Sequence, residues 1–492
     1  MADVVNGTQP GDPSAAAAAS VAAWEQANPG LVAGLTPVRE VAVAGDVAAT
    51  PTDQELWGAA LPAELKTSLD PPALARLVAR ADYLAVGRET PGRWAERLAG
   101  CRAALLPGRV VVAEADVAPI RQFVASGGLL IAFAHASLLN ASEAPRKDYL
   151  VANVLGAHYD GLVSFDSGVQ VTVTGDSIWA PQYAPPNVID GTPDTFWASV
   201  EAGPMPHWVE IAFSQPRTVA RADVACRPGF LLRDFEVQYR AGEEWRTAAA
   251  KVTDNQEWTI RCDFDKAVET GAVRLFVKRE EINGVDRVIA DVGEFTPYDD
   301  RGRPIIVPPF LIAARITDPA WAKANHADRM VLRSPAVRIR PASAQVLASF
   351  PSPTAGEGEL PFCTQSKLGK GRAYLFAVPE GSLGEESYAW ESLLRTFVGL
   401  PAIRHSGDES VLAFLSRGRD RYLLHIVDAA PTDSAERAKE VIVRVNTRAL
   451  GGIGSATLAP GDTALEISQH AEWVQFRAPL DPMASILLRR AR

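Results

Sequence analysis

Short apolar runs alternate with helix-like segments along the first third of the chain. Leu129–Phe133 is a five-residue apolar run, which is typical of a buried strand. Just before it, residues 114–126 place apolar side chains at the spacing of one helix face, and Gly127 follows as a stop. Because strands alternate with helices, we expect a parallel, wound sheet. The same alternation predicts strands at 38–45, 83–87 and 102–106, and helices at 71–80 and 91–98.

Between residues 168 and 298 the pattern changes to short alternating strands separated by turns, with no convincing helix. Helix-like and strand-like segments then return, at 319–325, 345–350, 372–378 and 386–397. The simplest organisation is one α/β domain interrupted by a β-sandwich, because a guest domain whose ends lie close together is tolerated at an exposed loop. The predicted domains are an α/β domain at 38–167 and 299–400 and the inserted sandwich at 168–298.

The two ends of the chain have different characters. Residues 401–492 contain strand-length apolar runs with turns between them, which predicts a small C-terminal antiparallel β-sandwich. Residues 1–37 are rich in Ala, Asn, Gly and Pro, and we expect an irregular lead-in or linker there.

Composition excludes several classes of function. The 492 residues fit about three domains. The net charge of −10 argues against nucleic-acid binding, and no apolar run approaches the ~20 residues of a membrane span. The N-terminus has no charged-then-apolar signal pattern, so we expect a cytoplasmic location for this chain. An extracytoplasmic location stays open if the chain is part of a longer protein.

The four cysteines do not form a disulfide framework. Cys101, Cys226, Cys262 and Cys363 are few and scattered, so we favour buried free thiols, although Cys226 and Cys262 lie in one predicted domain and could pair. The dispersed histidines make a zinc site improbable.

The most informative stretch runs from Asn187 to Trp197. This turn is crowded with Asp, Gly and Thr, it ends at a tryptophan, and an alternating strand follows. Hard cations such as calcium take several oxygen ligands from carboxylates and from the backbone carbonyls of tight turns. The stretch therefore predicts an oxygen-lined ion loop.

Residues 175–298 resemble a discoidin, or factor V/VIII type C, domain of the kind used as family 32 carbohydrate-binding modules. The resemblance implies a jelly-roll β-sandwich that binds ligands, most often sugars, and performs no chemistry. It also implies a structural calcium ion, with Asp190, Asp194, Thr195 and Glu294 as the metal site. The marks are Asp190-Gly191, Asp194-Thr195, Trp197, Trp208, Phe235–Tyr239, Glu244-Trp245, Val273–Val277 and Glu294.

The sugar site does not follow from this motif, because in the family that residues 175–298 resemble it lies on variable loops. Sugar hydroxyls suit polar side chains, and the apolar C–H face of a pyranose stacks on an aromatic ring. Trp197 and Trp208 are expected in the core. The candidates for carbohydrate binding are Tyr183, His207, Arg233, Trp258 and Arg287.

The interrupted α/β domain resembles the β-galactosidase trimerisation domain, which is similar to class I glutamine amidotransferases and has a flavodoxin-type sheet. The resemblance rests on 120–132, 148–156 and Gly369–Val378, and it implies a homo-oligomer, as a trimer. Such domains usually lie behind a catalytic barrel in bacterial glycoside hydrolases. A barrel needs about 250 residues and two carboxylates, and the three predicted modules leave no room for it.

We expect no catalytic residue in this chain. His135 and Ser137 would lie ~7 Å apart on one face of a continuing strand, beyond the ~3 Å that a general base needs. The first functional hypothesis is a non-catalytic carbohydrate-binding and assembly protein of a bacterial glycan-degradation system. The alternative is the rear portion of a glycoside hydrolase, of β-galactosidase or α-L-fucosidase type, whose barrel is absent from this chain. A hydrolase acting through Ser137 is a third hypothesis.

Overall fold

The protein divides into two compact units. Unit 1 comprises Met1–Leu162, Ile312–Phe350 and Glu359–Arg492, and unit 2 comprises Val163–Leu311 and Pro351–Gly358. The structure is a computed structural model that describes residues 13–43, 56–57, 69, 71–81, 83–86, 94–140, 145–165, 169–191, 195–200, 203–306, 310–354, 357–384, 387–407, 411–429 and 439–491. In those residues no helix is both long enough and apolar enough to cross a bilayer.

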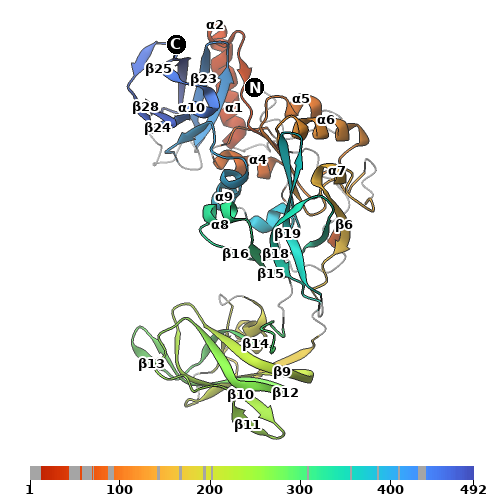
Figure 1. Ribbon diagram of the computed structural model, residues 1–492. Coiled ribbons are helices and arrows are strands. Elements are labelled where there is room, and N and C mark those ends of the chain that lie inside the picture. The colour runs from red at the N-terminus through yellow and green to blue at the C-terminus, as the bar shows by residue number, and fades with distance from the viewer. Residues whose placement is uncertain are drawn as a thin grey trace. The chain divides into compact units, whose positions relative to one another are not determined.

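Unit 1 contains a nine-stranded mixed sheet in the order β16-β15-β18-β19-β20-β5-β4-β2-β3 (Figure 1). One half is parallel, as the alternation of strands and helices predicts: β3 (Ala85–Val86), β2 (Val41–Val43), β4 (Ala103–Leu106), β5 (Leu129–Phe133) and β20 (Gly371–Phe376). The other half includes the antiparallel pairs β19–β20 and β15–β18. Its strands are β15 (Leu311–Ile316), β16 (Arg329–Arg333), β18 (Gln345–Pro351) and β19 (Glu359–Leu368).

The helices of this α/β part form two groups, which Figure 1 shows on either side of the sheet. In one group α9 packs against α4 and α8, and in the other α5 packs against α6. The bounds are α4 (Pro71–Arg80), α5 (Trp94–Leu98), α6 (Glu114–Ala125), α8 (Pro319–Ala324) and α9 (Ser387–Phe397). A short helix, α7 (Ala152–Leu155), leads into β6 (Ala157–Leu162), which pairs with β17 (Val337–Pro341).

Local sequence explains where α6 begins and ends. The Asp116 carboxylate accepts a hydrogen bond from Ala113 N at 2.9 Å, which satisfies a backbone donor that the first turn of a helix leaves unpaired. At the other end Gly127 takes a φ of 120°, which side-chain-bearing residues rarely adopt, so the chain can turn back into β5.

A two-layer sandwich ends unit 1. One sheet has the order β1-β22-β23-β29-β25-β26 and the other β21-β24-β28-β27, and their inner faces share a buried aliphatic core. The strands are β1 (Thr36–Pro37), β21 (Ile403–His405), β22 (Val411–Arg417), β23 (Arg421–Asp428), β24 (Glu440–Asn446), β25 (Ile453–Leu458), β26 (Thr463–Leu465), β27 (Ile467–His470), β28 (Trp473–Pro479) and β29 (Met483–Arg490), with a helical turn α10 (Thr447–Leu450).

The lead-in is helical, where the sequence analysis expects an irregular segment. Helix α1 (Pro13–Ala27) is followed by the short α2 (Pro29–Val32), and α1 lies along β23 (Figure 1). Ala17 and Val21 are buried against Phe414 and Val427. The alanine run has high helix propensity, and its small side chains let the helix pack closely on the sheet.

Unit 2 is the β-sandwich expected within 168–298. Its strands follow the path β11-β10-β12-β9-β14-β8, with β13 paired to β12 and β7 to β9. The bounds are β7 (Val171–Gly175), β8 (Trp197–Ala198), β9 (His207–Cys226), β10 (Leu231–Ala241), β11 (Glu244–Thr247), β12 (Thr259–Ile282), β13 (Val285–Arg287) and β14 (Asp291–Tyr298). Two 3-10 turns, η2 (Pro181–Tyr183) and η3 (Pro185–Ile189), precede β8.

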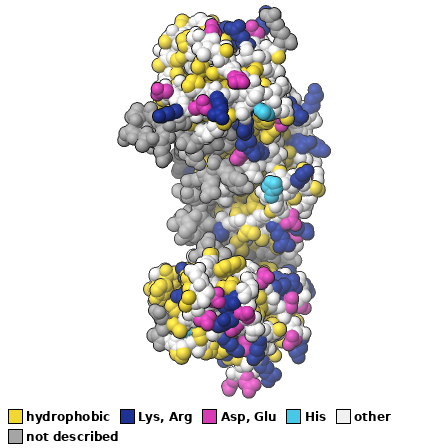
Figure 2. Space-filling view, turned by 90° about the vertical axis from the view of Figure 1, so that its left-hand side faces the viewer, with side chains coloured by type: hydrophobic (Ala, Val, Ile, Leu, Met, Phe, Trp, Pro, Cys, Tyr) yellow, Lys and Arg dark blue, Asp and Glu magenta, His cyan; other side chains and the backbone are white. Residues whose placement is uncertain are grey.

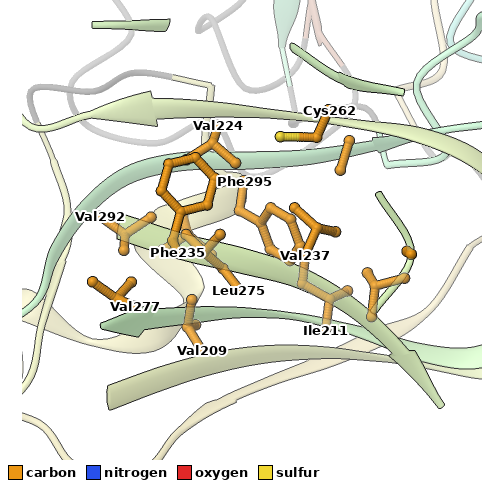
Figure 3. Packing of buried hydrophobic residues seen from close by; sticks show 14 of the residues in the cluster. Val209, Ile211, Val224, Phe235, Val237, Cys262, Leu275, Val277, Val292 and Phe295 are labelled. Atoms are coloured by element: carbon orange, nitrogen blue, oxygen red, sulfur yellow. The ribbon is translucent and has the colours of Figure 1, made fainter. Parts of the chain in front are cut away.

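Alternation along the long strands builds the core of unit 2. Figure 3 shows Phe235 and Phe295 among buried valines from several strands, and Trp197 is fully buried, as expected. Trp208 is only partly buried, unlike the core position that the sequence analysis assigns to it. Because Val209 points inward on β9, its neighbour Trp208 points outward. There the Arg274 guanidinium lies 6.0 Å from the Trp208 ring centroid.

All four cysteines are free thiols, and Cys226, Cys262 and Cys363 are buried. Cys101 is partly exposed. The favoured interpretation of separate thiols agrees with this arrangement, and Cys226 and Cys262 are not joined.

Candidate functional site

Several loops of unit 2 emerge at the same end of the sandwich. Strand register brings them together, because Cys226 lies opposite Val292, Leu231 opposite Glu281, and Ala198 opposite Asp291. The segments that meet there are 176–191, 195–196, 227–230, 254–258 and 282–290. We call this region the loop end of unit 2.

Three aromatic side chains of the loop end stack into what we call the aromatic ladder: Trp179, Tyr183 and Phe196. The Trp179 and Tyr183 rings are 5.3 Å apart and 14° from parallel, and the Tyr183 and Phe196 rings are 4.6 Å apart and 27° from parallel. Phe196 is buried, whereas Trp179 is 52% exposed. The ladder thus begins in the packed protein and ends in a half-exposed indole.

Backbone hydrogen bonds fix the ladder in place. Trp179 N donates to Ala198 O at 2.9 Å, which ties the loop to β8, and Tyr183 N donates to Ala180 O at 2.9 Å within the η2 turn. The side chain of Asn187 donates to Phe196 O at 3.0 Å. An aromatic ring held in this way loses little conformational entropy when a ligand covers it.

A charged cluster continues from the buried end of the ladder. The Arg227 guanidinium lies 3.8 Å from the Phe196 ring centroid and 3.9 Å from that of Phe230, and it pairs with Asp291 Oδ2 at 3.1 Å. Arg287 pairs with the same Asp291 oxygen at 2.8 Å and with Glu280 Oε1 at 3.3 Å. Burial and the neighbouring Asp291 carboxylate raise the pKa of Glu280 to about 9.

Three of the five predicted sugar-binding residues are engaged within the protein. His207 is buried, and its ring nitrogens face Asp176 Oδ2 at 2.6 Å and Val288 O at 3.0 Å, so its polar edge is occupied. Arg233 binds Asn255 O and Asp254 at 2.7 Å each. Arg287 belongs to the charged cluster described above. Arg233 and Arg287 therefore hold loops in place.

The other two predicted residues present aromatic surface. Tyr183 is the middle ring of the aromatic ladder, and in the described part of the chain its hydroxyl has no hydrogen-bond partner. Trp258 is 53% exposed at the end of a turn that Arg233 and Asn255 brace. The loop end thus carries two half-exposed indoles, Trp179 and Trp258.

The turn after η3 brings together three of the four predicted metal ligands. Gly191 N donates to Glu294 Oε1 at 2.7 Å, and Thr195 Oγ1 donates to Asp190 Oδ2 at 2.6 Å. Two carboxylates that are far apart in sequence thus approach one turn. Asp194 lies outside the described residues. Where the structure is described, no group of three or more His, Cys, Asp or Glu side chains is arranged to hold a metal ion.

His135 and Ser137 do not form a nucleophile–base pair on a strand. Strand β5 ends at Phe133, and a turn follows in which Ala134 and Ser137 have positive φ values of 36° and 62°. Both His135 and Ser137 are buried, and burial lowers the pKa of His135 to about 3. A buried hydroxyl on this turn is closed to an external substrate, which argues against the hypothesis of a Ser137 hydrolase.

Trp179, Phe196 and Arg227 are site residues that the sequence pattern does not reveal. Their spacing in a loop follows neither the helix period nor the strand period, so the stacking arises only from tertiary structure. The one available signal is the density of aromatic residues between positions 179 and 197.

Comparison with solved structures found distant similarity over nearly the whole chain. One match is α-L-fucosidase isoenzyme 2 from Paenibacillus thiaminolyticus, at 12% identity and a TM-score of 0.43, covering 96% of this chain and 51% of that chain. Another is β-galactosidase from Bacillus circulans sp. alkalophilus, at 10% identity and a TM-score of 0.44, covering 93% and 42%. This chain thus spans about half the length of these enzymes, or less.

Another match covers a smaller share of the chain. The family 32 carbohydrate-binding module of C. perfringens NanJ, solved in complex with galactose, is 13% identical with a TM-score of 0.22, covering 28% of this chain and 97% of that chain. A search of curated proteins found no match to the chain. The F5/8 type C domain family matches residues 170–288. The β-sandwich of unit 2 is therefore an F5/8 type C, or discoidin, domain.

Proposed function

We propose that the discoidin domain of unit 2 binds a glycan through the aromatic ladder, and that the chain is a non-catalytic carbohydrate-binding and assembly protein of a glycan-degradation system. The observation that carries this proposal is the half-exposed Trp179 indole, backed by Tyr183 and Phe196. The apolar C–H face of a pyranose packs well on such a ring. Because the ring is already ordered, binding costs little entropy.

Polar groups beside the indole suit the rest of a sugar. The Tyr183 hydroxyl is at hand for a sugar hydroxyl, and the Trp258 ring offers a second stacking surface for a longer saccharide. The face of unit 2 that Figure 2 shows is not dominated by one charge. Figure 2 shows basic and acidic side chains interleaved on the part of unit 2 in view, and many are paired, such as Arg279 with Asp234 at 2.8 Å. A neutral, hydroxyl-rich ligand matches this balance better than a polyanion does.

We also propose a calcium ion in the turn after η3. The Asp190 and Glu294 carboxylates would hold it with the Thr195 hydroxyl and nearby backbone carbonyls, a donor set of hard oxygens that suits Ca²⁺. The contact between Gly191 N and Glu294 supports the fit, because it already brings Glu294 to the turn that carries Asp190. Asp194 completes the predicted set. Bound there, the ion would join the turn before β8 to strand β14.

Self-association of the α/β part is the assembly half of the proposal. It rests on the resemblance of that part to a trimerisation domain, and a parallel sheet such as β3-β2-β4-β5-β20 is what that resemblance implies. The expected species is a homotrimer.

A glycan-array screen of the full chain with calcium present tests the proposed function. We expect saturable binding to one or a few related glycans, and competition by the free sugar. Vesicles of phosphatidylserine and phosphatidylcholine serve as the comparison, because exposed aromatic loops also insert into lipid surfaces. Binding to vesicles with no binding to any glycan would overturn the proposal.

A further inference from the structure

The outer face of the four-stranded sheet in unit 1 is hollowed at one place. The hollow has a volume of about 390 Å³ and is lined by Arg404, Arg444, His470, Trp473 and Gln475. That volume lies at the low end of the ~300–1,000 Å³ typical of small-molecule sites. It belongs to the C-terminal sandwich and therefore lies on a different unit from the discoidin domain.

Strand register places these side chains in two neighbouring rows. Arg404 lies opposite Arg444, and Arg444 lies opposite Gln475. The adjacent row pairs Trp473 with His470. The residues between them, such as Val445 and Val474, point to the other side and are buried in the core of the sandwich. Alternation thus gives one face to the core and this polar face to the hollow.

Two arginines directly opposite each other on neighbouring strands repel, so each needs a carboxylate or another acceptor beside it. Arg404 Nη2 is held by Glu391 Oε1 of α9 at 3.1 Å, and Glu391 also pairs with Arg395. Arg444 Nε donates to Gln475 Oε1 at 2.9 Å. In the described part of the chain the two terminal nitrogens of Arg444 make no hydrogen bond and no ion pair. Among the described residues, Arg404 and Arg395 share the Glu391 carboxylate.

The remaining lining groups suit a sugar ring. Trp473 is partly exposed, its ring borders the hollow, and its indole N–H has no partner among the described residues. His470 is exposed and its Nε2 lies 3.1 Å from Ser468 Oγ, so hydroxyl-binding groups stand at the rim. A guanidinium binds a carboxylate through two parallel N–H bonds, and an indole stacks on a pyranose face.

The geometry points to a second carbohydrate site, on the outer face of β21, β24, β28 and β27, that takes a saccharide bearing a carboxylate. The saccharide is one that contains a uronic acid. Arg444 binds its carboxylate, and Arg404 adds positive charge beside it. Trp473 stacks on the sugar ring, and Gln475 and His470 bind hydroxyls. This site does not depend on the aromatic ladder of the discoidin domain.

Isothermal titration of the full chain tests this site, with tri-galacturonate as the probe and galactotriose as its neutral counterpart at constant ionic strength. We expect tri-galacturonate to bind at least about tenfold more tightly, and Arg444→Gln to remove that preference. Arg477→Gln is the matched control, because Arg477 lies on the same face of β28 but pairs with Glu440 at 2.7 Å outside the hollow. It should bind like the unsubstituted chain.

Two further measurements keep this site distinct from the proposed function. Trp179→Ala should leave tri-galacturonate binding unchanged, whereas Trp473→Leu should weaken it. Equal affinity for the charged and neutral trisaccharides would overturn the inference, as would unchanged binding by Arg444→Gln. Equal affinity for inorganic sulfate would also overturn it, because the sugar ring would then contribute nothing.

Discussion

Glu280 and Asp291 are neighbouring buried carboxylates whose protonation links the stability of the discoidin domain to pH. Burial and the Asp291 charge raise the pKa of Glu280 from 4.5 to about 9. Between these two pKa values the unfolded chain releases a proton that the folded chain retains, so the folded state loses stability as pH rises. The stability that protonated Glu280 contributes is fully present below the pKa of this carboxyl in the unfolded chain. It is lost as pH rises to its pKa in the folded chain.

Glu280→Gln should flatten this dependence. The introduced amide has no proton to release. We therefore expect the melting temperature of the variant minus that of the unsubstituted chain to increase from about pH 5 to about pH 8. Scanning calorimetry of the full chain measures the difference. Asp286→Asn is the control, since Asp286 lies exposed on the adjacent strand β13 and should leave the slope unchanged. A parallel pH dependence for Glu280→Gln and the unsubstituted chain would contradict the prediction.

Close packing explains why the Gly-Lys-Gly sequence ends in a glycine at the first residue of β20, Gly371. A Cβ atom placed on Gly371 would lie 2.0 Å from Val124 O and 2.2 Å from Gly128 O, both of them backbone atoms that cannot move aside. We therefore expect Gly371→Ala to destabilise unit 1 by about 1–3 kcal/mol or more, as overpacking does. Chemical denaturation measures this loss. Gly30→Ala is the control within unit 1, because no heavy atom lies within 4 Å of the added Cβ, and an equal loss in both variants would refute the packing argument.

Among the elements, those with strong periodicity follow from the sequence. Helix α4 and strand β5 have the bounds that their apolar spacing predicts, and β22, β23, β24, β28 and β29 lie on the predicted apolar runs. Helix α1 does not follow, because its alanines carry little contrast between faces and its contacts with Phe414 and Val427 are distant in sequence. The aromatic ladder cannot be predicted from the sequence for the same reason, because loop positions 179, 183 and 196 meet only in three dimensions.

The turn between η3 and β8 is the element on which calcium should act. Removing the ion would leave the Asp190 and Glu294 carboxylates near one turn without their shared partner, so the turn should loosen. A ligand that binds only the folded state stabilises it by ~2.7 kcal/mol at a hundredfold excess over its dissociation constant. With a chelator, hydrogen exchange in peptides covering 186–198 should therefore be faster than with calcium.

Asp190→Ala should show fast exchange in this segment under both conditions. Peptides covering β22 and β23 serve as the internal control, because those strands carry no comparable loop, and their exchange should not respond to calcium. Identical exchange of 186–198 with calcium and with chelator, together with no bound metal by elemental analysis, would exclude the ion site.

At the scale of the whole molecule, the α/β part should mediate self-association. Multi-angle light scattering of the full chain at micromolar concentration should give the mass of a trimer, in line with the resemblance of this part to a trimerisation domain. The chain has a calculated mass of 52.7 kDa, so the monomer and the trimer are well separated. A monomeric mass across the accessible concentrations would remove the assembly half of the proposed function.

The central claim is that the discoidin domain binds a glycan on the aromatic ladder, and titration calorimetry of Trp179→Ala tests it most directly. With the glycan that the unsubstituted chain binds best, truncating the outer ring should weaken binding by about fivefold or more, since stacking on an exposed aromatic ring contributes ~1 kcal/mol or more. Trp258→Ala, which removes the other half-exposed indole, should have the smaller effect. Unchanged affinity for Trp179→Ala, with its fold intact by circular dichroism, would contradict the account.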